Sequence, residues 1–225
     1  MTRWSAIVLL LIVGLLGGCT LVPEREPVDR SWFLLELPAE PAPRLAEGDQ
    51  PLAVELGSVR VAPAYSGKGL VYRLGDHRYE SDYYNEWFLR PAEQVEQLLR
   101  ERWTRSGSAL ELVDNAEAAR AEGRTAVQLH VLVTALYGDL DATRLEGQAA
   151  TDPGTPLRGV GRVGLRTQIR GDGHARLAHM ESEHGIDRRS AARLVAALSQ
   201  ATADVLAELE EQLLREGDTG TGDRP

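Results

Sequence analysis

Histidines are the first residues of this chain whose type and spacing suggest chemistry. His174, His179 and His184 recur every five residues, and imidazole nitrogens at suitable spacing bind Zn²⁺. On a strand, an odd spacing places successive side chains on opposite faces, so these three do not converge on one ion. No cysteine or acidic cluster completes a tetrahedral set at the usual spacing. We therefore predict that the chain binds no metal.

Two glycine-rich stretches match nucleotide-binding motifs only in their letters. Residues 67–69, Gly-Lys-Gly, lack the earlier glycine and the following Ser or Thr of a phosphate loop. Residues 159–164, Gly-Val-Gly-Arg-Val-Gly, have the dinucleotide spacing but lie within a strand-like alternation instead of opening a helix. The acidic residues are spread evenly along the chain, and no carboxylate pair stands out. We expect no cofactor and no enzymatic active site.

Three arginines share one face of a predicted strand. Arg162, Arg166 and Arg170 recur every four residues, which on a strand keeps them on one side. Guanidinium groups bind phosphates and carboxylates with paired hydrogen bonds. This face is a candidate site for an anionic ligand, such as a lipid phosphate or an acidic partner. Pairing with the protein's own carboxylates is the alternative interpretation.

A tyrosine-rich segment is the second candidate contact region. Five of the six tyrosines fall between positions 65 and 84. Aromatic side chains are enriched at protein interfaces, although they also fill cores. The candidate partner or oligomer contacts are Tyr65, Tyr72, Tyr83, Tyr84 and Trp87.

The only cysteine, Cys19, ends an uncharged apolar run that begins at Trp4. The run is 15 residues long, shorter than the roughly 20 residues of a spanning helix, and it follows a single basic residue, as in a secretory signal. Residues 16–19, Leu-Gly-Gly-Cys, resemble the lipobox of bacterial lipoproteins, in which a peptidase cuts before an acylated cysteine. The resemblance implies a signal peptide over residues 1–18 and a lipid anchor at Cys19. A free thiol, or a signal peptide that is cut elsewhere, is the alternative.

The residue after the cysteine and the segment that follows it predict where the domain lies. Thr20 stands where an aspartate is the usual inner-membrane retention signal, so the resemblance implies an anchor in the outer membrane, on its periplasmic face. Residues 20–30 are polar and contain two prolines, which is typical of a tether. Fully extended, they reach at most about 40 Å. We expect the folded domain to stay close to its membrane.

Net charge excludes two classes of partner. Removal of residues 1–18 takes away one basic residue, Arg3, and leaves 34 acidic and 24 basic residues, a net charge of −10. A chain with this charge lacks the basic surface with which general nucleic-acid binders neutralise phosphates. The same charge disfavours unspecific adsorption to an anionic membrane. With Cys19 acylated, no thiol remains for a disulfide.

Apolar periodicity predicts the elements that position these residues. The clearest strand covers residues 125–137, where every second residue from Val127 to Tyr137 is apolar. The other predicted strands cover residues 31–37, 52–61, 69–73, 110–113, 157–170 and 174–183, and another strand after a turn is an option for residues 139–150. Amphipathic helices are predicted from Pro91 to near Gly107 and over residues 190–215, closed by Gly217. Loops are expected over residues 38–51 and 151–156, and residues 114–123 have no strong pattern.

The order of these elements predicts an α+β fold. A mixed, largely antiparallel sheet offers an apolar face, and two amphipathic helices need such a surface, so we expect both helices on one face. The predicted organisation is a signal peptide (1–18), a lipidated tether (19–30), one domain (31–216) and a disordered tail (217–225).

Besides the lipobox, the chain contains the motifs Trp-Phe-Leu-Leu (32–35), Val-Ala-Pro-Ala-Tyr (61–65), Gly-Leu-Val-Tyr-Arg (69–73), Tyr-Tyr-Asn-Glu-Trp (83–87) and Pro-Ala-Glu (91–93). With these motifs the chain resembles the ABC-type transport auxiliary lipoproteins, which include the paraquat-inducible protein C type. The resemblance covers nearly the whole mature chain and is most specific over residues 52–103. Residues 139–187 match only in pattern.

The resemblance implies a periplasmic subunit that works with an inner-membrane ATPase, a permease and an MCE-domain protein. Such systems move phospholipids or other apolar molecules between the two membranes. ATP-driven work belongs to the other subunits, and no catalytic residues carry over, so a docking or conduit role is expected. Direct contact with phospholipid and assembly of several copies stay open. The alternatives are an assembly or pilotin-like lipoprotein of another envelope complex and, third, an envelope hydrolase.

Overall fold

The long strand β6 (Ala126–Leu140) is the axis of the fold, as predicted, but the prediction of a single apolar face from Val127 to Tyr137 is wrong. A bulge between Val133 and Ala135 shifts the register, so Leu136 and Leu140, and not Tyr137, continue the face that packs in the main core. The computed structural model describes residues 29–38, 43–46, 48–105, 107–140, 159–171, 173–186 and 190–221, with side chains in the last segment as far as residue 217. The predicted signal peptide, the anchor Cys19 and nearly all of the tether lie outside these residues. So do most of residues 139–150, the predicted loop at 151–156 and residues 222–225.

Strand β6 divides the sheet into an unbranched side and a forked side. One edge of β6 pairs antiparallel with β7 (Gly159–Arg170), and β7 pairs antiparallel with β8 (Ala175–Ile186). The other edge is shared by two parallel strands: β2 (Leu52–Val61) pairs with the first half of β6, and β3 (Gly69–Arg73) pairs near its end. The sheet therefore opens into two branches on this side.

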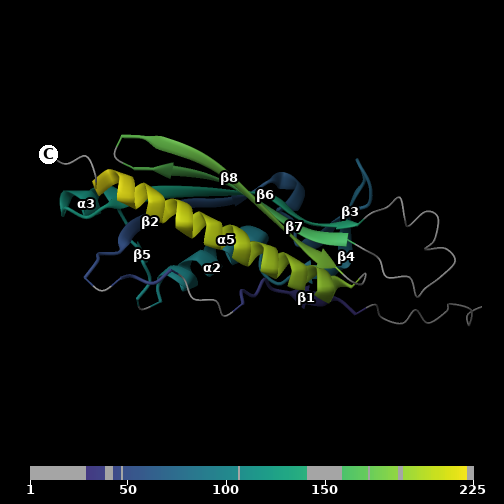
Figure 1. Cartoon of the computed structure of the whole chain (residues 1–225). Coiled ribbons are helices and arrows are strands. Elements are labelled where there is room, and N and C mark those ends of the chain that lie inside the picture. Colours follow the sequence, from purple (N-terminus) through teal and green to yellow (C-terminus); the bar gives the residue numbers. More distant parts are fainter. Residues whose placement is uncertain are drawn as a thin grey trace, which may run out of the picture.

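Each branch ends in a short edge strand. Beyond β2 lies β5 (Leu110–Leu112), and beyond β3 lie β4 (Tyr79–Trp87) and then β1 (Ser31–Phe33). Among the described residues, four of the seven strand pairings are parallel, whereas the longest two, β6 with β7 and β7 with β8, are antiparallel. The predicted α+β class with a mixed sheet is confirmed. Figure 1 shows β1, β3 and β4 at one end of the molecule and α3 with β5 at the other.

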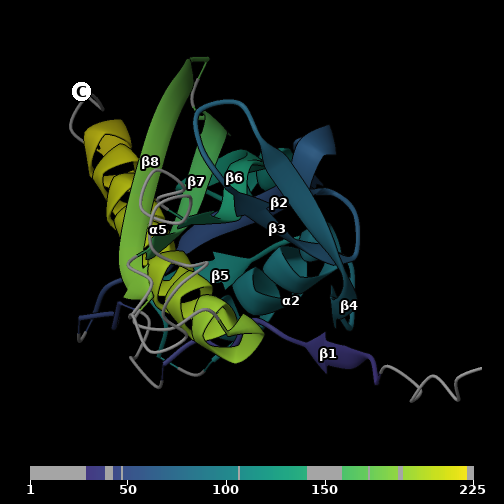
Figure 2. The same ribbon diagram turned by 90° about the vertical axis from the view of Figure 1, so that its right-hand side faces the viewer.

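Helices α2 (Pro91–Trp103) and α5 (Ala191–Thr221) cover one face of the sheet, as predicted. Figure 2 shows α2 beside the strands of the forked side and α5 alongside β7 and β8. Apolar side chains of both helices join those of the sheet in one core, which includes Leu99, Leu129 and Leu209, each fully buried. Burial of this apolar surface is the main favourable contribution to folding.

A buried ion pair joins the two helices. Arg102 of α2 donates to Glu210 of α5 from Nε at 2.5 Å and from Nη2 at 2.8 Å, and Trp103 Nε1 donates to Glu210 Oε1 at 2.9 Å. The side chains of Arg102 and Glu210 are 7% and 1% exposed. Such a pair must be well hydrogen-bonded to offset the loss of hydration, and three donated hydrogen bonds meet that need.

Three sequence predictions need correction. Helix α2 ends at Trp103, before the predicted end near Gly107. Thr104 is its C-cap residue, and the backbone N–H of Thr104 donates to Arg100 O. Helix α5 runs to Thr221, past Gly217, so part of the predicted disordered tail is helical. Residues 114–123 contain a short helix, α3 (Ala116–Ala121), whose N-cap Asn115 accepts a hydrogen bond from Ala118 N.

Helix α3 is missed by the sequence because its packing uses alanines. Ala116 and Ala119 are buried against Ala53 of β2 and Ala126 of β6. These sheet residues belong to a cluster separate from the main core, so α3 covers part of the face opposite α2 and α5. A helix of six residues has too few turns to show an apolar period.

Candidate functional site

The tyrosine-rich segment does not form one surface: its aromatic side chains divide between the interior and the exterior. The interior group surrounds Tyr137 of β6, which is 6% exposed. Tyr65, in the 3-10 turn η1 (Pro63–Tyr65), stacks on Tyr137 with ring centroids 5.5 Å apart and planes 13° apart. Tyr79 of β4, which is itself 45% exposed, meets the same ring edge-on at 5.6 Å and covers the outer side of this group. These stacked and edge-on geometries are the favourable ones for aromatic pairs.

Charged side chains border this tyrosine cluster. Arg73 donates two hydrogen bonds to the carboxylate of Asp139, from Nε at 2.9 Å and from Nη2 at 2.5 Å, and its guanidinium lies 5.8 Å from the Tyr137 ring centroid. Arg162 Nη2 lies 3.8 Å from Asp139 Oδ2 and 2.6 Å from Glu183 Oε1. The arginines and carboxylates neutralise one another within the protein.

The tyrosine cluster is built to stay uncharged. Burial, with the neighbouring Tyr79 and Tyr137 rings, raises the pKa of the Tyr65 phenol to about 12. Burial likewise raises the pKa of Tyr137. The hydrogen bonds to Asp139 raise the pKa of Arg73 above its usual range. None of these groups changes its charge near neutral pH, so the cluster is suited to hold β3, β4 and β6 together rather than to transfer protons.

The exterior group stands on a bulge of β4. Gly69 pairs with Glu86 and Val71 with Ser81, so the four residues 82–85 oppose a single residue of β3. Asp82 holds this loop of backbone: its Oδ1 accepts from the backbone N–H of Tyr84 at 2.9 Å and of Asn85 at 3.0 Å. We call residues 82–85 the tyrosine bulge.

The tyrosine bulge carries the two most accessible tyrosines of the predicted interface. Tyr83 is 64% exposed and Tyr84 45% exposed, and their rings meet edge-on at 5.3 Å. Arg30 lies over the Tyr83 ring at 4.4 Å, a cation–π distance. The bulge thus presents two ordered aromatic rings to solvent, which is what a contact surface needs.

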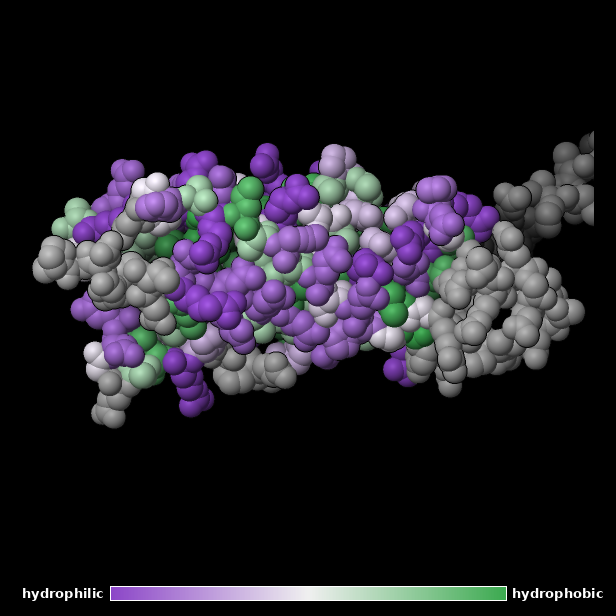
Figure 3. Space-filling model, turned by 45° about the horizontal axis from the view of Figure 1, so that its top comes forward, coloured by the Kyte–Doolittle hydropathy of each residue, from purple (hydrophilic) through white to green (hydrophobic). Residues whose placement is uncertain are grey.

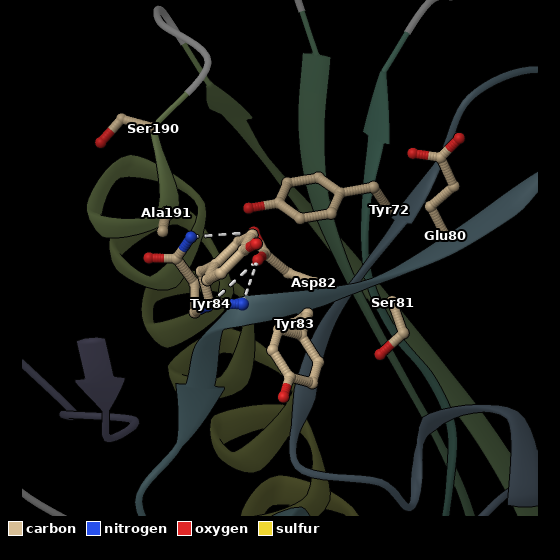
Figure 4. A pocket seen from close by; sticks show the side chains of 9 residues that line it. Tyr72, Glu80, Ser81, Asp82, Tyr83, Tyr84, Ser190 and Ala191 are labelled. Carbon is tan, nitrogen blue, oxygen red and sulfur yellow. Dashed lines mark hydrogen bonds between the residues drawn. The ribbon is translucent and has the colours of Figure 1, made fainter. Parts of the chain in front are cut away.

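An open pocket of about 430 Å³ lies beside the bulge. Figure 4 shows its walls: Tyr72 of β3 and Glu80 of β4 face residues Ser190 and Ala191 at the start of α5, while Tyr83 points away from Tyr72. The lining is mostly polar and includes two carboxylates, those of Glu80 and Asp82. Such a lining suits a polar or cationic group better than an acyl chain or a phosphate.

A second exposed aromatic surface, missed by the sequence, adjoins the bulge. Trp32 and Phe88 are each 58% exposed, and Leu34 is 42% exposed. Trp32 pairs in register with Glu86, and Phe88 N donates to Phe33 O at 2.8 Å, which continues the pairing of β1 with β4. We call Trp32, Leu34 and Phe88 the aromatic edge. The alternation of these residues with Phe33 and Leu35 is a half-buried pattern and was the available signal. The prediction of a buried strand over 31–37 is therefore wrong, since β1 ends at Phe33 and one of its sides is exposed.

Hydrogen bonds from both helices fix the segment that follows β1. Gln94 of α2 accepts from Leu35 N at 2.7 Å and donates to Leu89 O at 2.9 Å, while Ser199 of α5 accepts from Glu36 N at 3.1 Å. Gln94 is almost fully buried. A strand of only three residues is thereby held against the core, and the aromatic edge with it.

The five predicted interface residues therefore lie in different places. Trp87 is 2% exposed and belongs to the main core, so its prediction as an interface residue is wrong. Its position on β4 explains this, since it points to the face that α2 covers. Tyr65 is half-buried in the tyrosine cluster and Tyr72 is half-buried in the pocket wall. Only Tyr83 and Tyr84 project into solvent, and their role as contacts stays a prediction.

The predicted arginine face is also divided. Arg162, Arg166 and Arg170 do share one side of β7, but Arg162 is occupied by Asp139 and Glu183, as the alternative interpretation proposes. Arg166 is exposed and lies opposite Leu132 of β6 and His179 of β8. Arg170 is exposed, with Nη2 3.4 Å from Gln168 Oε1. An anionic ligand on this face remains a prediction that concerns Arg166 and Arg170.

The predicted separation of the histidines is confirmed for two of them. His179 Nε2 lies 3.2 Å from Glu181 on the open face, whereas His184 Nε2 donates to Asp204 of α5 at 2.7 Å. Among the described residues, no group of three or more His, Cys, Asp and Glu side chains is placed to hold a metal ion.

Ser182, His184 and Asp204 lie together and have the composition of a catalytic triad. Ser182 Oγ and His184 Nε2 both donate to the same oxygen, Asp204 Oδ2, each at 2.7 Å. In a hydrolase the histidine lies between the acid and the serine, whereas here the carboxylate lies between them. Burial raises the pKa of Asp204, but these two hydrogen bonds outweigh it and hold the pKa below its usual value. The grouping ties β8 to α5.

One face of the molecule is mainly hydrophilic. Figure 3 shows it, with hydrophobic residues in small separate patches. No helix within the described part of the chain is both long enough and apolar enough to cross a membrane.

Comparisons with known proteins identify a matching family and structures that share the fold. A family model described as "ABC-type transport auxiliary lipoprotein component" matches residues 33–210. The comparison with curated proteins gave no match. The chain is similar to protein XCC0632 from Xanthomonas campestris, of family DUF330, with 15% identity, a TM-score of 0.61, and coverage of 85% of this chain and 99% of that one. It is also similar to the crystal structure of an uncharacterized protein, with 18% identity, a TM-score of 0.57, and coverage of 82% and 99%. At these identities the two structures show a shared fold alone.

Proposed function

Since the chain belongs to the family of ABC-type transport auxiliary lipoprotein components, we propose that it is the outer-membrane-anchored, non-catalytic subunit of an ABC/MCE-type intermembrane lipid transport system. In this proposal, acylated Cys19 holds the domain on the periplasmic face of the outer membrane. The partners are the MCE-domain protein of the system and, through it, the permease and the ATPase. The match of the family model over residues 33–210 is the observation that carries the proposal.

The side chains on the described surface support a docking role more than a catalytic one. Its pocket beside the tyrosine bulge is open and polar, and its charged groups are largely paired within the protein. An enzyme needs titratable groups that converge on a substrate with pKa values matched to the reaction. Docking needs instead an ordered surface with accessible aromatic side chains, and Tyr83 and Tyr84 supply one. We therefore place the contact with the partner or with other copies of the chain at the tyrosine bulge.

Affinity capture tests the proposal. The acylated protein, solubilised from membranes of its own cells, is expected to bring down an MCE-domain protein, and deletion of its gene is expected to disturb lipid distribution between the membranes. A double variant, Tyr83→Asp with Tyr84→Asp, is expected to lose the partner while it folds normally. The matched control is Leu177→Asp, an equally drastic change at an exposed apolar residue of β8.

Two results would count against the proposal. Capture of a β-barrel or a secretin in place of an MCE-domain protein would favour an assembly or pilotin-like role. A mass spectrum of the mature protein without an acyl group on Cys19 would remove the proposed anchor.

A further inference from the structure

The aromatic edge is an apolar surface that the fold leaves uncovered. Trp32, Leu34 and Phe88 lie on the outer side of β1 and β4, on the opposite side from Phe33, Leu35 and Trp87, which pack in or against the core. Burial of apolar side chains lowers the free energy, and these three remain in water. An exposed apolar patch of this kind usually marks a contact site.

The edge is also rigid, as a contact site should be. Gln94 and Ser199 accept hydrogen bonds from the backbone directly after β1, and Lys68 Nζ donates to Phe88 O at 3.0 Å. These bonds fix the backbone that carries the three side chains, so less conformational entropy is lost when the edge binds. The backbone of the aromatic edge is therefore preorganised.

Basic side chains border the edge. Arg30 and Lys68 lie beside it, through contacts of Arg30 with Tyr83 and Glu86 and of Lys68 with Phe88, and Arg90 follows Phe88 by two residues and is exposed. The region also holds carboxylates: Glu86, with a side chain that is 20% exposed, and the exposed Glu36 and Glu93. Aromatic rings with basic side chains at their border suit the interfacial region of a bilayer, where rings sit at headgroup level and cations meet lipid phosphates.

The position of the edge in the chain indicates which surface covers it. Trp32 follows Cys19 by only thirteen residues, which fully extended reach at most about 45 Å. Helix α5 alone, with 31 residues, is about 46 Å long. A domain tethered at Cys19 therefore keeps its β1 end within reach of the bilayer, and the tether raises the effective concentration of lipid at this end.

We propose that the aromatic edge rests on the membrane that holds Cys19, with Trp32 and Phe88 at the level of the lipid headgroups. The inference rests on the proposed function, because it takes Cys19 as the membrane anchor. It adds an orientation: β1 and β4 face the bilayer, and the end with α3 and the C-terminal part of α5 points away from it. Figure 1 shows these two ends on opposite sides of the molecule.

Tryptophan fluorescence on vesicles tests the proposal independently of acylation in the cell. The chain from Cys19 onward contains every described residue, and its single cysteine allows coupling to maleimide-phospholipid in vesicles of phosphatidylethanolamine and phosphatidylglycerol. Of its three tryptophans, Trp87 and Trp103 are each 2% exposed, so Trp32 is the one that responds to its surroundings. With dibrominated acyl chains in the vesicles, we expect up to about one third of the emission to be quenched, because Trp32 lies at the interface.

Two variants make the quenching specific. Trp32→Phe is expected to abolish it. Leu177 is 69% exposed near the opposite end of the sheet, so Leu177→Trp in the Trp32→Phe background places an equally accessible reporter where no lipid contact is expected, and it should not be quenched.

Several results would overturn the proposal. Trp32 emission that is unaffected by brominated lipid and fully quenched by acrylamide would show that the edge stays in water. Equal quenching of the Leu177→Trp reporter would show that the domain has no fixed orientation. Protection of Trp32 from acrylamide that grows with protein concentration in the absence of vesicles would show that a second copy covers the edge. Because coupling is chemical, absence of an acyl group on Cys19 in cells would contradict the proposed function without altering any of these results.

Discussion

Trp32 and Trp87 lie almost opposite each other on paired strands, yet they meet different surroundings. Phe33 of β1 is in register with Trp87 of β4, and Trp32 with Glu86, so the two tryptophans are one step apart along the same pairing. Trp87 is 2% exposed and Trp32 58% exposed. The difference comes from strand alternation, because successive side chains of a strand point to opposite faces.

The same division separates the tyrosines. Tyr65, Tyr79 and Tyr137 meet in one cluster, whereas Tyr83 and Tyr84 stand on the bulge. Aromatic content alone thus does not distinguish a core from a contact surface in this protein. The face of the strand, and the bulge that changes it, decide the role of each ring.

Truncation of the two tryptophans is expected to give the largest contrast. Trp87→Ala leaves a cavity in the main core and should lower the free energy of unfolding by about 3–5 kcal/mol. Trp32→Ala removes an exposed ring and should change it by less than about 0.5 kcal/mol. Urea denaturation of both variants measures this; equal losses would mean that the aromatic edge is also part of the core.

A methyl group at Gly69 is expected to disturb the bulge that separates the two sets of tyrosines. A Cβ there would lie 2.5 Å from the backbone oxygen of Asp82, so Gly69→Ala should cost about 1–3 kcal/mol through strain. Gly67→Ala is the control, because a Cβ at that position meets no atom within 4 Å. Thermal unfolding of the two variants should separate them clearly, and a similar loss in both would contradict the close approach.

Alkaline pH is expected to destabilise the cluster of Tyr65, Tyr79 and Tyr137 and to leave the tyrosine bulge unaffected. The pKa of Tyr65 is raised to about 12, so the folded state keeps a proton that the unfolded state loses from about pH 10. Stability should be unaffected by this group below pH 10 and should fall as pH rises from 10 towards 12. Absorbance at phenolate wavelengths, followed with stability, measures it; Tyr65→Phe should make the decline shallower, and an unchanged decline would place the cause elsewhere.

Charge on the bulge is expected to have the smallest effect on folding and a selective effect on assembly. Tyr83→Asp should leave the free energy of unfolding within about 0.5 kcal/mol of the original, because the ring is mostly in water. If copies of the chain associate through the bulge, light scattering should show a lower mass for this variant. A mass equal to that of the unaltered protein would remove the bulge from any contact between copies.

Much of the fold could be predicted because alternation and helix periodicity are local. Strand β6 and helix α5 follow from apolar residues at every second position or on one helical stripe. Helix α3 could not be found, because its contacts are alanines brought together by β2 and β6 from distant parts of the chain. The ends of α2 and α5 were misplaced since glycine is only one of several ways to end a helix.

The candidate site could be predicted in part. Tyr83 and Tyr84 stand where a contact residue should, but Trp87 does not, because one residue type serves both faces of a strand. The bulge that exposes the two tyrosines depends on Asp82 and on the pairing of β4 with β3, neither of which has a distinctive sequence pattern. Pairing of Arg162 with Asp139 and Glu183 likewise depends on contacts between strands that only the folded chain shows.

The buried pair between Arg102 and Glu210 links the packing of α2 to the synthesis of α5. The two residues are 108 positions apart, so the guanidinium emerges long before its carboxylate during synthesis. An ionised carboxylate or guanidinium is costly to bury unless it is well paired, so we expect Arg102 and Glu210 to be buried together, after α5 has been made. The packing of α2 and the packing of α5 on the sheet are then expected to be one cooperative step.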